Sequence, residues 1–355
     1  MKNIFRIFAV VVVLAALTSQ SAYAGNDERR GTAGASELLI NPWARNTGWG
    51  GVNVANVRGL SSMFSNVAGL AFVESIEVGY TNTMLYGGKS GLSSGATINT
   101  FGLAVRIFER GVAGVYIMSM GLGDIDVTTY LSPEGGNGTF SPSYMNINVA
   151  YAHSFTNTIH GSILFKVVTE STDNVSGSGL GIDAGIQYVT GEDDELKFGI
   201  SLKNWGPSMK FGGTGLSLQM VNTAGNNFTV ETRAAEMELP TCLNIGISYD
   251  FLFENWDQRL TLAAAFTSNA FLRDNYIVGV EYSLLKMFQL RCGYIMQPGL
   301  LSGDAATANN GICAGASVDV PLAKDDGKTG ITIDYSFQSA SPMRGTHSIG
   351  ASLRF

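Results

Sequence analysis

The stretch ELKFGISLKNW, residues 195–205, decides the fold of this chain. Apolar side chains alternate there with charged or small ones, with Leu196, Phe198, Ile200 and Leu202 set against Lys197, Gly199, Ser201 and Lys203. Successive side chains of a β-strand point to opposite faces, so alternation over this length predicts a strand with one apolar and one polar face.

The same alternation recurs along most of the chain. It is clear in GLGIDAGIQYV (179–189) and in LNIGISYDFLF (243–253), and most such segments run ten to thirteen residues. Strands of soluble proteins more often have about five or six residues, whereas a tilted strand that crosses a bilayer needs about nine to eleven. We count fourteen segments, at residues 74–86, 97–108, 112–124, 144–155, 159–171, 179–190, 196–206, 241–253, 259–268, 275–285, 288–297, 311–322, 329–338 and 345–355.

The connections between these segments alternate in length. The long connections cover residues 87–96, 125–143, 207–240 and 298–310, and the short ones cover 109–111, 156–158, 191–195, 254–258, 285–287 and 323–328. Outer-membrane barrels have short periplasmic turns and longer external loops. The sequence therefore predicts an all-β fold, a 14-stranded antiparallel transmembrane β-barrel over residues 74–355, with both of its ends on the periplasmic side.

Residues 1–24 have the layout of a cleaved secretory signal peptide. Two basic residues precede an uncharged apolar run, residues 7–17, and the small-residue site Ala22-Tyr23-Ala24 follows. The apolar run is too short to span a bilayer as a helix. We expect export through this signal peptide to the outer membrane of a Gram-negative bacterium.

Composition argues against several classes of function. Charged residues make up only 14% of the chain, whereas ordinary soluble proteins have about 25%. The formal net charge of −7 becomes −9 without residues 1–24, which hold two basic residues and no acidic one, and this argues against nucleic acid as a partner. Cys242, Cys292 and Cys313 form no CxxC pair and the histidines lack ligand spacing, so we expect no disulfide framework and no metal site. No nucleophile and base stand together in the sequence, so we expect no cofactor and no enzymatic activity.

The polar face of the predicted strands carries charges of both signs, and it points into the barrel. An unpaired buried charge is costly, so we expect these charges to compensate one another as ion pairs. The acidic members are Glu77, Glu170, Asp183, Asp250, Glu281, Asp319 and Asp334, and the basic ones are Arg106, Lys166, Lys197, Lys203, Arg259, Arg291 and Arg354.

Residues 25–73 differ from the rest of the chain. The stretch 31–72 has neither strand alternation nor a long helical stripe, yet it is too apolar and aromatic for a free tail. We expect this periplasmic segment to fold into the wide barrel as a plug.

The last residues, HSIGASLRF (347–355), form the closing strand of the predicted barrel. A terminal amphipathic strand that ends in an aromatic residue resembles the signal read by the outer-membrane barrel-assembly machinery. We therefore expect Phe355 to act as the assembly signal, that machinery to be a partner during biogenesis, and outer-membrane lipid to surround the finished barrel.

Several motifs resemble the PorV/PorQ family of outer-membrane proteins. The stretch ASELLINPWARNTGWGG (35–51) is similar to the family's opening, and the matching residues are Leu38, Leu39, Ile40, Ala44, Arg45, Gly48, Gly50 and Gly51. A second motif, FSNVAGLA (64–71), keeps Asn66 and Gly69 but has Ser65 in place of a tryptophan and Val67 in place of a proline. Two further stretches are similar to the family, KNWGPSMKF (203–211) and ELPTCLNIGISYDF (238–251).

The resemblance implies a barrel similar to the long-chain fatty acid transporter fold and a role in type IX protein secretion. The best-known member of the family is a shuttle that caps the lateral opening of a giant translocon barrel and receives cargo by a C-terminal signal domain. The implied partners are therefore the secretion translocon barrel and C-terminal-signal cargo proteins.

Two functions follow as hypotheses. In the first, the barrel is a secretion shuttle or scaffold whose external loops bind these proteins, because exposed aromatic, Met and Leu side chains suit protein recognition. The candidate partner-binding residues are Tyr130, Phe140, Met209, Phe211, Met220, Phe228, Leu300 and Leu301. The alternative is a transporter of hydrophobic small molecules, which needs an apolar path that the charged, glycine-rich lumen argues against. A general diffusion porin is disfavoured by the plug.

Overall fold

Fourteen long antiparallel strands close into a barrel in the computed structural model, which describes residues 27–90, 95–253, 257–297, 309, 311–322, 329–341 and 343–355. Each strand pairs with the next in the chain, and the first also pairs with the last, Glu77 opposite Arg354. The predicted fold class is confirmed. The barrel strands are β1 (Ile76–Met84), β2 (Thr97–Phe108), β3 (Gly111–Gly121), β6 (Ser143–Ser154), β7 (Ile159–Thr172), β8 (Val175–Thr190), β9 (Leu196–Trp205), β14 (Cys242–Phe253), β15 (Gln258–Asn269), β16 (Asn275–Leu284), β17 (Phe288–Met296), β18 (Gly311–Pro321), β19 (Gly330–Gln338) and β20 (Thr346–Arg354).

The two faces of the wall are reversed relative to a soluble protein. The outward side chains of Phe165 and Leu290 are 55% and 62% exposed, while the inward Lys166 and Asp183 are 4% and 2% exposed. Exposed large apolar residues continue around the barrel, as a surface in contact with hydrocarbon requires. Among the described residues, no helix is long and apolar enough to cross a membrane.

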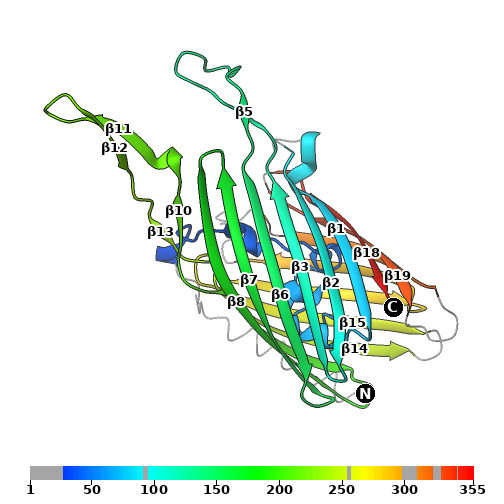
Figure 1. Ribbon diagram of the computed structural model, residues 1–355. Helices are drawn as coiled ribbons and strands as arrows, with labels where there is room; N and C mark the ends of the chain where they lie inside the picture. Colours follow the sequence, from blue (N-terminus) through cyan, green and yellow to red (C-terminus); the bar gives the residue numbers. More distant parts are fainter. Residues whose placement is uncertain are drawn as a thin grey trace.

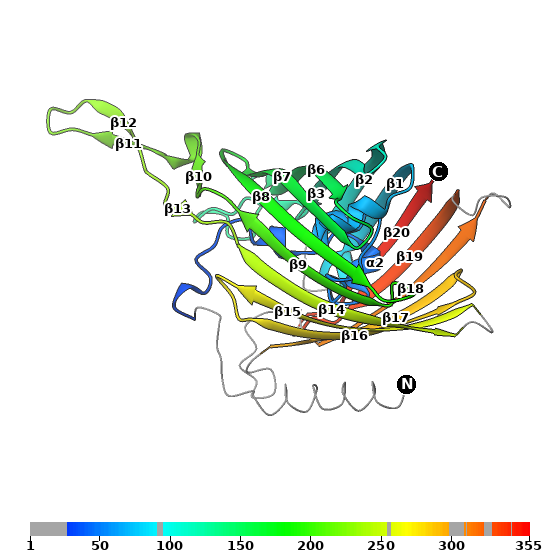
Figure 2. The ribbon, with the colours of Figure 1, turned by 90° about the horizontal axis from the view of Figure 1, so that it is seen from below.

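Two hairpins project from the end of the barrel that carries the long connections (Figure 1, Figure 2). One is formed by β4 (Ile125–Asp126) and β5 (Thr139–Phe140), and the other by β11 (Ser217–Val221) and β12 (Asn227–Glu231). We call this end of the barrel the long-loop end and the opposite one the short-turn end. Two short 3₁₀ turns also lie in these connections, η4 (Leu85–Ser90) and η5 (Thr214–Leu216).

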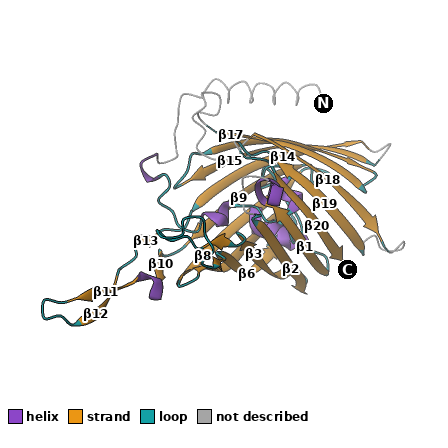
Figure 3. Cartoon of the chain, turned by 90° about the horizontal axis from the view of Figure 1, so that it is seen from above, coloured by secondary structure: helices purple, strands orange, loops and turns teal. Residues whose placement is uncertain are grey.

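The N-terminal segment, residues 27–75, starts outside the long-loop end of the barrel and then enters the ring of strands (Figure 3). It begins near the long-loop end, where Gly34 N donates to Glu238 O at 2.9 Å, and it leads into β1 at the short-turn end. The segment therefore runs the length of the barrel, although its role as a plug remains a prediction. Its helical turns are η1 (Asp27–Arg29), η2 (Ser36–Leu39), α2 (Ala44–Thr47), α3 (Ser62–Ser65) and η3 (Val67–Phe72).

Inward-facing glycines of the wall give this segment its space. A Cβ atom at Gly199 of β9 would stand 2.3 Å from Val54 O, and one at Gly293 of β17 would stand 2.4 Å from Trp49 O. Both distances are shorter than any real Cβ contact, so a larger residue at either position would displace the segment. The glycines that the sequence places on the inner face of the wall thus form the surface on which the N-terminal segment packs.

Most of the charges predicted to face inward form ion pairs. Among the described residues, four of these charges form no ion pair: Glu77 and Arg106, which bond to backbone groups, and Glu170 and Lys203. The pairs are Lys166–Asp183 at 2.7 Å, Lys197–Asp250 at 2.5 Å, Arg259–Glu281 and Arg291–Glu281 at 2.6 Å, Arg354–Asp319 at 2.5 Å and Arg291–Asp334 at 3.9 Å.

Two neighbouring strands of the wall are interrupted at the same level near the long-loop end. β9 stops before Gly206-Pro207, and β14 begins just after Pro240. A further short strand, β10 (Met209–Gly212), then continues beside β8, and β13 (Glu236–Met237) pairs with β10. Proline has no backbone N–H to give to a ladder, so other groups must complete the hydrogen bonding there.

Asn204 supplies these hydrogen bonds. It is fully buried, and its φ of 59° lies in the left-handed region that asparagine tolerates better than most residues. Its Oδ1 accepts from Lys166 Nζ at 2.7 Å, and its Nδ2 donates to Pro240 O at 3.0 Å. Its backbone N–H donates to Asp183 Oδ1 at 2.7 Å, next to the Lys166–Asp183 ion pair. One asparagine therefore connects three strands at the interruption.

We predict that Asn204→Ala lowers the free energy of unfolding by about 2–4 kcal/mol, because two buried partners lose their bonds and alanine is strained at positive φ. Asn204→Gly should lose about 1 kcal/mol less, because glycine adopts a positive φ without strain but still lacks the side-chain hydrogen bonds. Denaturant unfolding in detergent micelles, followed by tryptophan fluorescence, measures both. Asn227→Ala in the exposed hairpin is the control and should change the free energy by less than about 0.5 kcal/mol. Wild-type stability of Asn204→Gly would contradict the role of the side chain.

Candidate functional site

A cavity of about 400 Å³ lies inside the barrel towards the long-loop end, and we call it the outer cavity. One wall comes from the N-terminal segment and the others from β9, β14, β15, β16 and β17. Its apolar lining includes Leu39, Ile40, Phe64, Leu272, Ile277 and Ile295, and its polar lining includes Lys203, Asn244, Thr267, Asn269 and Gln297. The outer cavity therefore combines an apolar surface with a few polar groups, as ligand sites commonly do.

Lys203 is the only cation that lines the outer cavity among the described residues. It is 5% exposed, and its Nζ lies 3.3 Å from the centre of the Phe64 ring. In the part of the chain that the structure describes, no carboxylate forms an ion pair with it. A cation over an aromatic face is stabilised by the ring quadrupole, but its hydrogen-bonding capacity is left open. Lys203 can therefore donate a hydrogen bond to an oxygen of a bound molecule.

The amide and hydroxyl groups beside Lys203 hold one another in place. Thr267 Oγ1 donates to Asn244 Oδ1 at 2.7 Å, and Asn244 Nδ2 donates to Ser201 Oγ at 3.2 Å. Gln297 Nε2 donates to Asn275 Oδ1 at 2.7 Å. Because these groups satisfy each other, the polar wall keeps its shape without a ligand.

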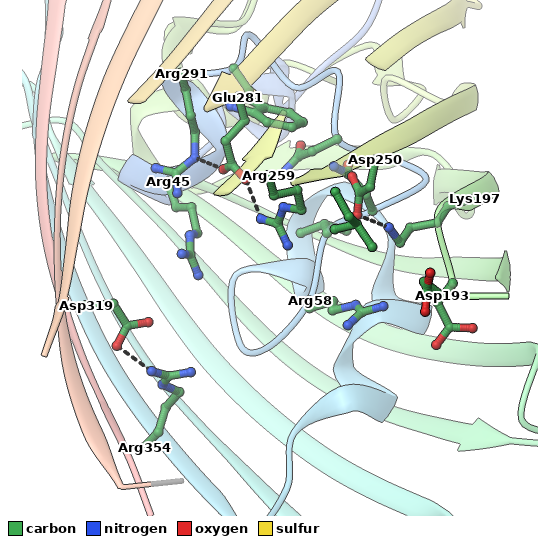
Figure 4. A pocket seen from close by; sticks show the side chains of 16 residues that line it. Arg45, Arg58, Asp193, Lys197, Asp250, Arg259, Glu281, Arg291, Asp319 and Arg354 are labelled. Carbon is green, nitrogen blue, oxygen red and sulfur yellow. Dashed lines mark hydrogen bonds and ion pairs between the residues drawn. The ribbon is translucent and has the colours of Figure 1, made fainter. Parts of the chain in front are cut away.

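A second cavity of about 440 Å³ lies on the other side of the N-terminal segment, and we call it the vestibule. Trp49 and Asn53 line the vestibule, whereas Gly50, Gly51 and Val54 line the outer cavity. The turn from Trp49 to Val54 therefore separates the two spaces. Figure 4 shows the charged side chains of the vestibule, among them Arg45 and Arg58 of the N-terminal segment.

Some motif residues of the N-terminal segment pack in the interior, and others line one of the two cavities. Leu38 and Ala44 are buried, and a Cβ at Gly48 would stand 2.8 Å from Gly315 Cα. Of the others, Leu39, Ile40, Gly50 and Gly51 line the outer cavity, and Arg45 lines the vestibule.

The second motif fixes the end of the segment to the wall. Asn66 Nδ2 donates to Val54 O at 2.9 Å and to Ile186 O of β8 at 3.0 Å. A Cβ at Gly69 would stand 2.1 Å from Val57 O, so only glycine fits there. Both residues therefore have a structural role in holding the segment.

The candidate partner-binding residues do not share one environment. Tyr130 is fully exposed, and Met220 and Phe228 are 50% and 45% exposed. Phe140 is half-buried, and Phe211 is half-buried against Gly177. Leu300 and Leu301 lie outside the described residues.

The prediction that Met209 binds a partner is wrong. Its side chain is 1% exposed and packs near Gly34 and Gly179, because β10 attaches to β8 and turns Met209 inward. It is therefore unavailable to a partner. Phe355 continues the closing strand, where its N–H donates to Ile76 O at 2.9 Å, and its side chain is 51% exposed. Its role in assembly remains a prediction.

Sequence reasoning did not identify the outer cavity. Lys203 was placed on the inward face, but its lack of a carboxylate partner depends on residues far along the chain. Arg45 and Arg58 are not among the lumen charges that strand alternation predicts, because they lie in the N-terminal segment, which has no such alternation. Their arginine character was the available signal, since a basic residue in an apolar buried segment needs a specific environment.

No protein-family model and no curated protein sequence matches this chain. Among solved structures it is similar to a FadL homologue of Pseudomonas aeruginosa, with a TM-score of 0.54, 12% identity, and coverage of 89% of this chain and 99% of that chain. It is also similar to the toluene transporter TodX of Pseudomonas putida, with a TM-score of 0.51, 12% identity, and coverage of 84% and 94%. A mutant of TodX, a monoaromatic hydrocarbon channel, gives a TM-score of 0.54, 14% identity, and coverage of 89% and 98%.

TodX is a toluene transporter and a monoaromatic hydrocarbon channel. At such low identity the similarity assigns the fold alone. The fold of this chain is that of the FadL-like barrels, and the exposed apolar face of its wall supports an outer-membrane location. Cleavage of residues 1–24 and membership of the PorV/PorQ family remain predictions.

Proposed function

We propose that this protein takes up small hydrophobic molecules at the long-loop end of the barrel and holds them in the outer cavity. The observation that carries the proposal is a cavity of about 400 Å³ with an apolar wall, inside a barrel whose fold is shared with hydrocarbon transporters. Ligand cavities typically have volumes of about 300–1,000 Å³. The comparisons therefore favour the transport hypothesis over the secretion hypothesis of the sequence analysis.

The lining assigns a role to each part of a bound molecule. Its apolar body would lie against Leu39, Ile40 and Ile277, which gains about 25 cal/mol for each Å² of apolar surface removed from water. An oxygen on the same molecule would accept a hydrogen bond from Lys203. Passage beyond the outer cavity requires the turn from Trp49 to Val54 to move, because that turn separates the outer cavity from the vestibule.

We predict that Ile277→Trp weakens binding of a hydrophobic fluorescent probe by about tenfold or more, because the indole fills the outer cavity, and tenfold corresponds to about 1.4 kcal/mol. Titration of 1-N-phenylnaphthylamine into the purified protein in non-ionic detergent measures this. Ile200→Trp is the matched control: Ile200 is 50% exposed on the outer face of β9, so its variant should bind as the wild type does. Equal affinity in all three proteins would remove the outer cavity as the binding site.

A further prediction concerns the role of the N-terminal segment as a plug. Deletion of residues 31–65 should raise the permeability of the outer membrane to small hydrophilic solutes, because this stretch carries the turn that separates the two cavities. Uptake of a chromogenic β-lactam into intact cells measures the permeability. Deletion of residues 217–231, the projecting hairpin, is the control and should leave permeability unchanged. A barrel that assembles without residues 31–65 and admits no more solute would argue against the plug.

A secretion scaffold of the PorV/PorQ type is the second candidate function. The observation that favours it is the hairpin of β11 and β12, which projects away from the wall (Figure 1). Leu218, Met220 and Phe228 lie on one face of this hairpin and are 45–58% exposed. Its partners would be a secretion translocon barrel and cargo with a C-terminal signal domain.

For this candidate we predict that a tagged wild-type protein, isolated from the native envelope, carries a secretion barrel or signal-bearing cargo with it. A variant with Leu218→Ser, Met220→Ser and Phe228→Ser should lose that partner, because the apolar face of the hairpin is removed. The control is Ser217→Ala with Gln219→Ala on the opposite face, which should keep it. Isolation of the wild-type protein without a partner would count against the scaffold function.

A further inference from the structure

The vestibule at the short-turn end is lined mainly by charged side chains, and the proposed uptake of hydrophobic molecules does not use it. Its lining comes from the N-terminal segment and from β9, β14, β15, β16, β17, β18 and β20. The basic members of the lining are Arg45, Arg58, Lys197, Arg259, Arg291 and Arg354, and the acidic ones are Asp193, Asp194, Asp250, Glu281 and Asp319.

Two ion pairs of the vestibule are oriented with the arginine towards the open space. The side chain of Arg259 is 41% exposed, whereas its partner Glu281 is 9% exposed. Arg354 is 40% exposed and its partner Asp319 is 13% exposed. In both pairs the carboxylate lies against the wall and the guanidinium borders the cavity. These two pairs therefore present guanidinium groups to the vestibule, whereas Arg291 and Lys197, at 2% and 5% exposure, are buried in their own pairs.

Two of these guanidinium groups also have unused donors. The Nη1 atoms of Arg259 and Arg354 form no hydrogen bond within the described part of the chain. Their Nη2 atoms donate to Glu281 at 2.6 Å and to Asp319 at 2.5 Å. Each guanidinium group therefore keeps N–H donors with which it can bind an oxyanion in the vestibule.

Arg58 adds a cation that forms no ion pair in the described part of the chain. Its guanidinium lies 4.3 Å from the centre of the Phe72 ring, which holds the planar group while leaving its N–H edges open. Figure 4 shows Arg58 in the same cavity as Arg259 and Arg354. Three guanidinium groups from three separate elements therefore border one space.

We propose that the vestibule is a binding site for a small oxyanion, a phosphate or carboxylate group, held by Arg58 and by the free edges of Arg259 and Arg354. Guanidinium groups bind such oxygens through paired, charge-assisted hydrogen bonds. The few apolar side chains of the lining, among them Val57 and Leu252, offer little surface for a hydrocarbon tail. The site recognises the anionic group itself, so inorganic phosphate binds as well as a phosphate ester of a long alkyl chain does.

Two carboxylates on the short turn after β8 weaken anion binding at this site. Asp193 and Asp194 line the vestibule from that turn and are exposed, so they repel an approaching anion. Asp194 has a φ of 56°, a conformation that asparagine also tolerates. The double variant Asp193→Asn with Asp194→Asn should therefore keep the turn and increase the affinity.

The test is equilibrium dialysis of radiolabelled inorganic phosphate against the full-length barrel in non-ionic detergent at low ionic strength. The wild type should bind one phosphate saturably, and added salt should weaken binding. Arg58→Gln should reduce affinity by about tenfold or more. This variant leaves no carboxylate unpaired, so the barrel should still fold, and Arg58→Lys should bind with intermediate affinity because it keeps the charge but loses the fork.

Arg110→Gln is the matched control, because Arg110 lies on a short turn at the same end but does not line the vestibule. Its affinity should stay within about twofold of the wild type. The proposal is overturned by an absence of saturable binding up to about 10 mM phosphate, or by equal losses in Arg58→Gln and Arg110→Gln. Tighter binding of dodecyl phosphate than of inorganic phosphate would overturn the claim that the anionic group alone is recognised.

Discussion

The pairing of β1 with β20 is the constraint on which the rest of the structure depends. In hydrocarbon there is no water to bond an exposed strand edge, so a sheet can cross the bilayer only when its first and last strands meet. Here Glu77 to Met84 face His347 to Arg354 without a break. In the closed barrel, one set of alternating side chains from every strand forms an apolar outer surface, and the other set forms the inner surface. The interruption at Pro207 and Pro240 obeys the same rule, because Asn204 and its partners satisfy the groups that proline cannot.

Closure of fourteen strands also creates an interior that the wall cannot fill with its own side chains. The N-terminal segment occupies this interior, and it fits there because the strands carry inward-facing glycines without side chains. Val54 O and Trp49 O approach the backbone at Gly199 and Gly293 so closely that no side chain would fit. The remaining volume is divided into the outer cavity and the vestibule, one partly apolar and the other lined with charges.

The strands could be predicted from the sequence, whereas the interior could not, and the reason is the range of the interactions. Alternation such as Phe198, Gly199 and Ile200 is a local pattern, and the exposure of each face follows from it. The helical turns α2 and α3 have four residues each and are too short to be stable alone, so contacts with distant strands fix them. The burial of Met209 cannot be predicted for the same reason, since it depends on the pairing of β10 with β8 and with β13.

The hydrogen bonds of Val54 and Val57 determine how the two cavities can be joined. Gln187 Nε2 of β8 donates to Val57 O at 3.1 Å and to Val54 O at 3.3 Å, and Asn66 also donates to Val54 O. A hydrocarbon in the outer cavity offers no acceptor for these amides, so it cannot compensate for their loss if the turn moves. A molecule with an oxygen can, because it replaces the carbonyl as acceptor. Under the proposed transport function, the segment would therefore oppose purely apolar molecules more strongly than molecules with a polar group, and the polar lining beside Lys203 would favour the same molecules.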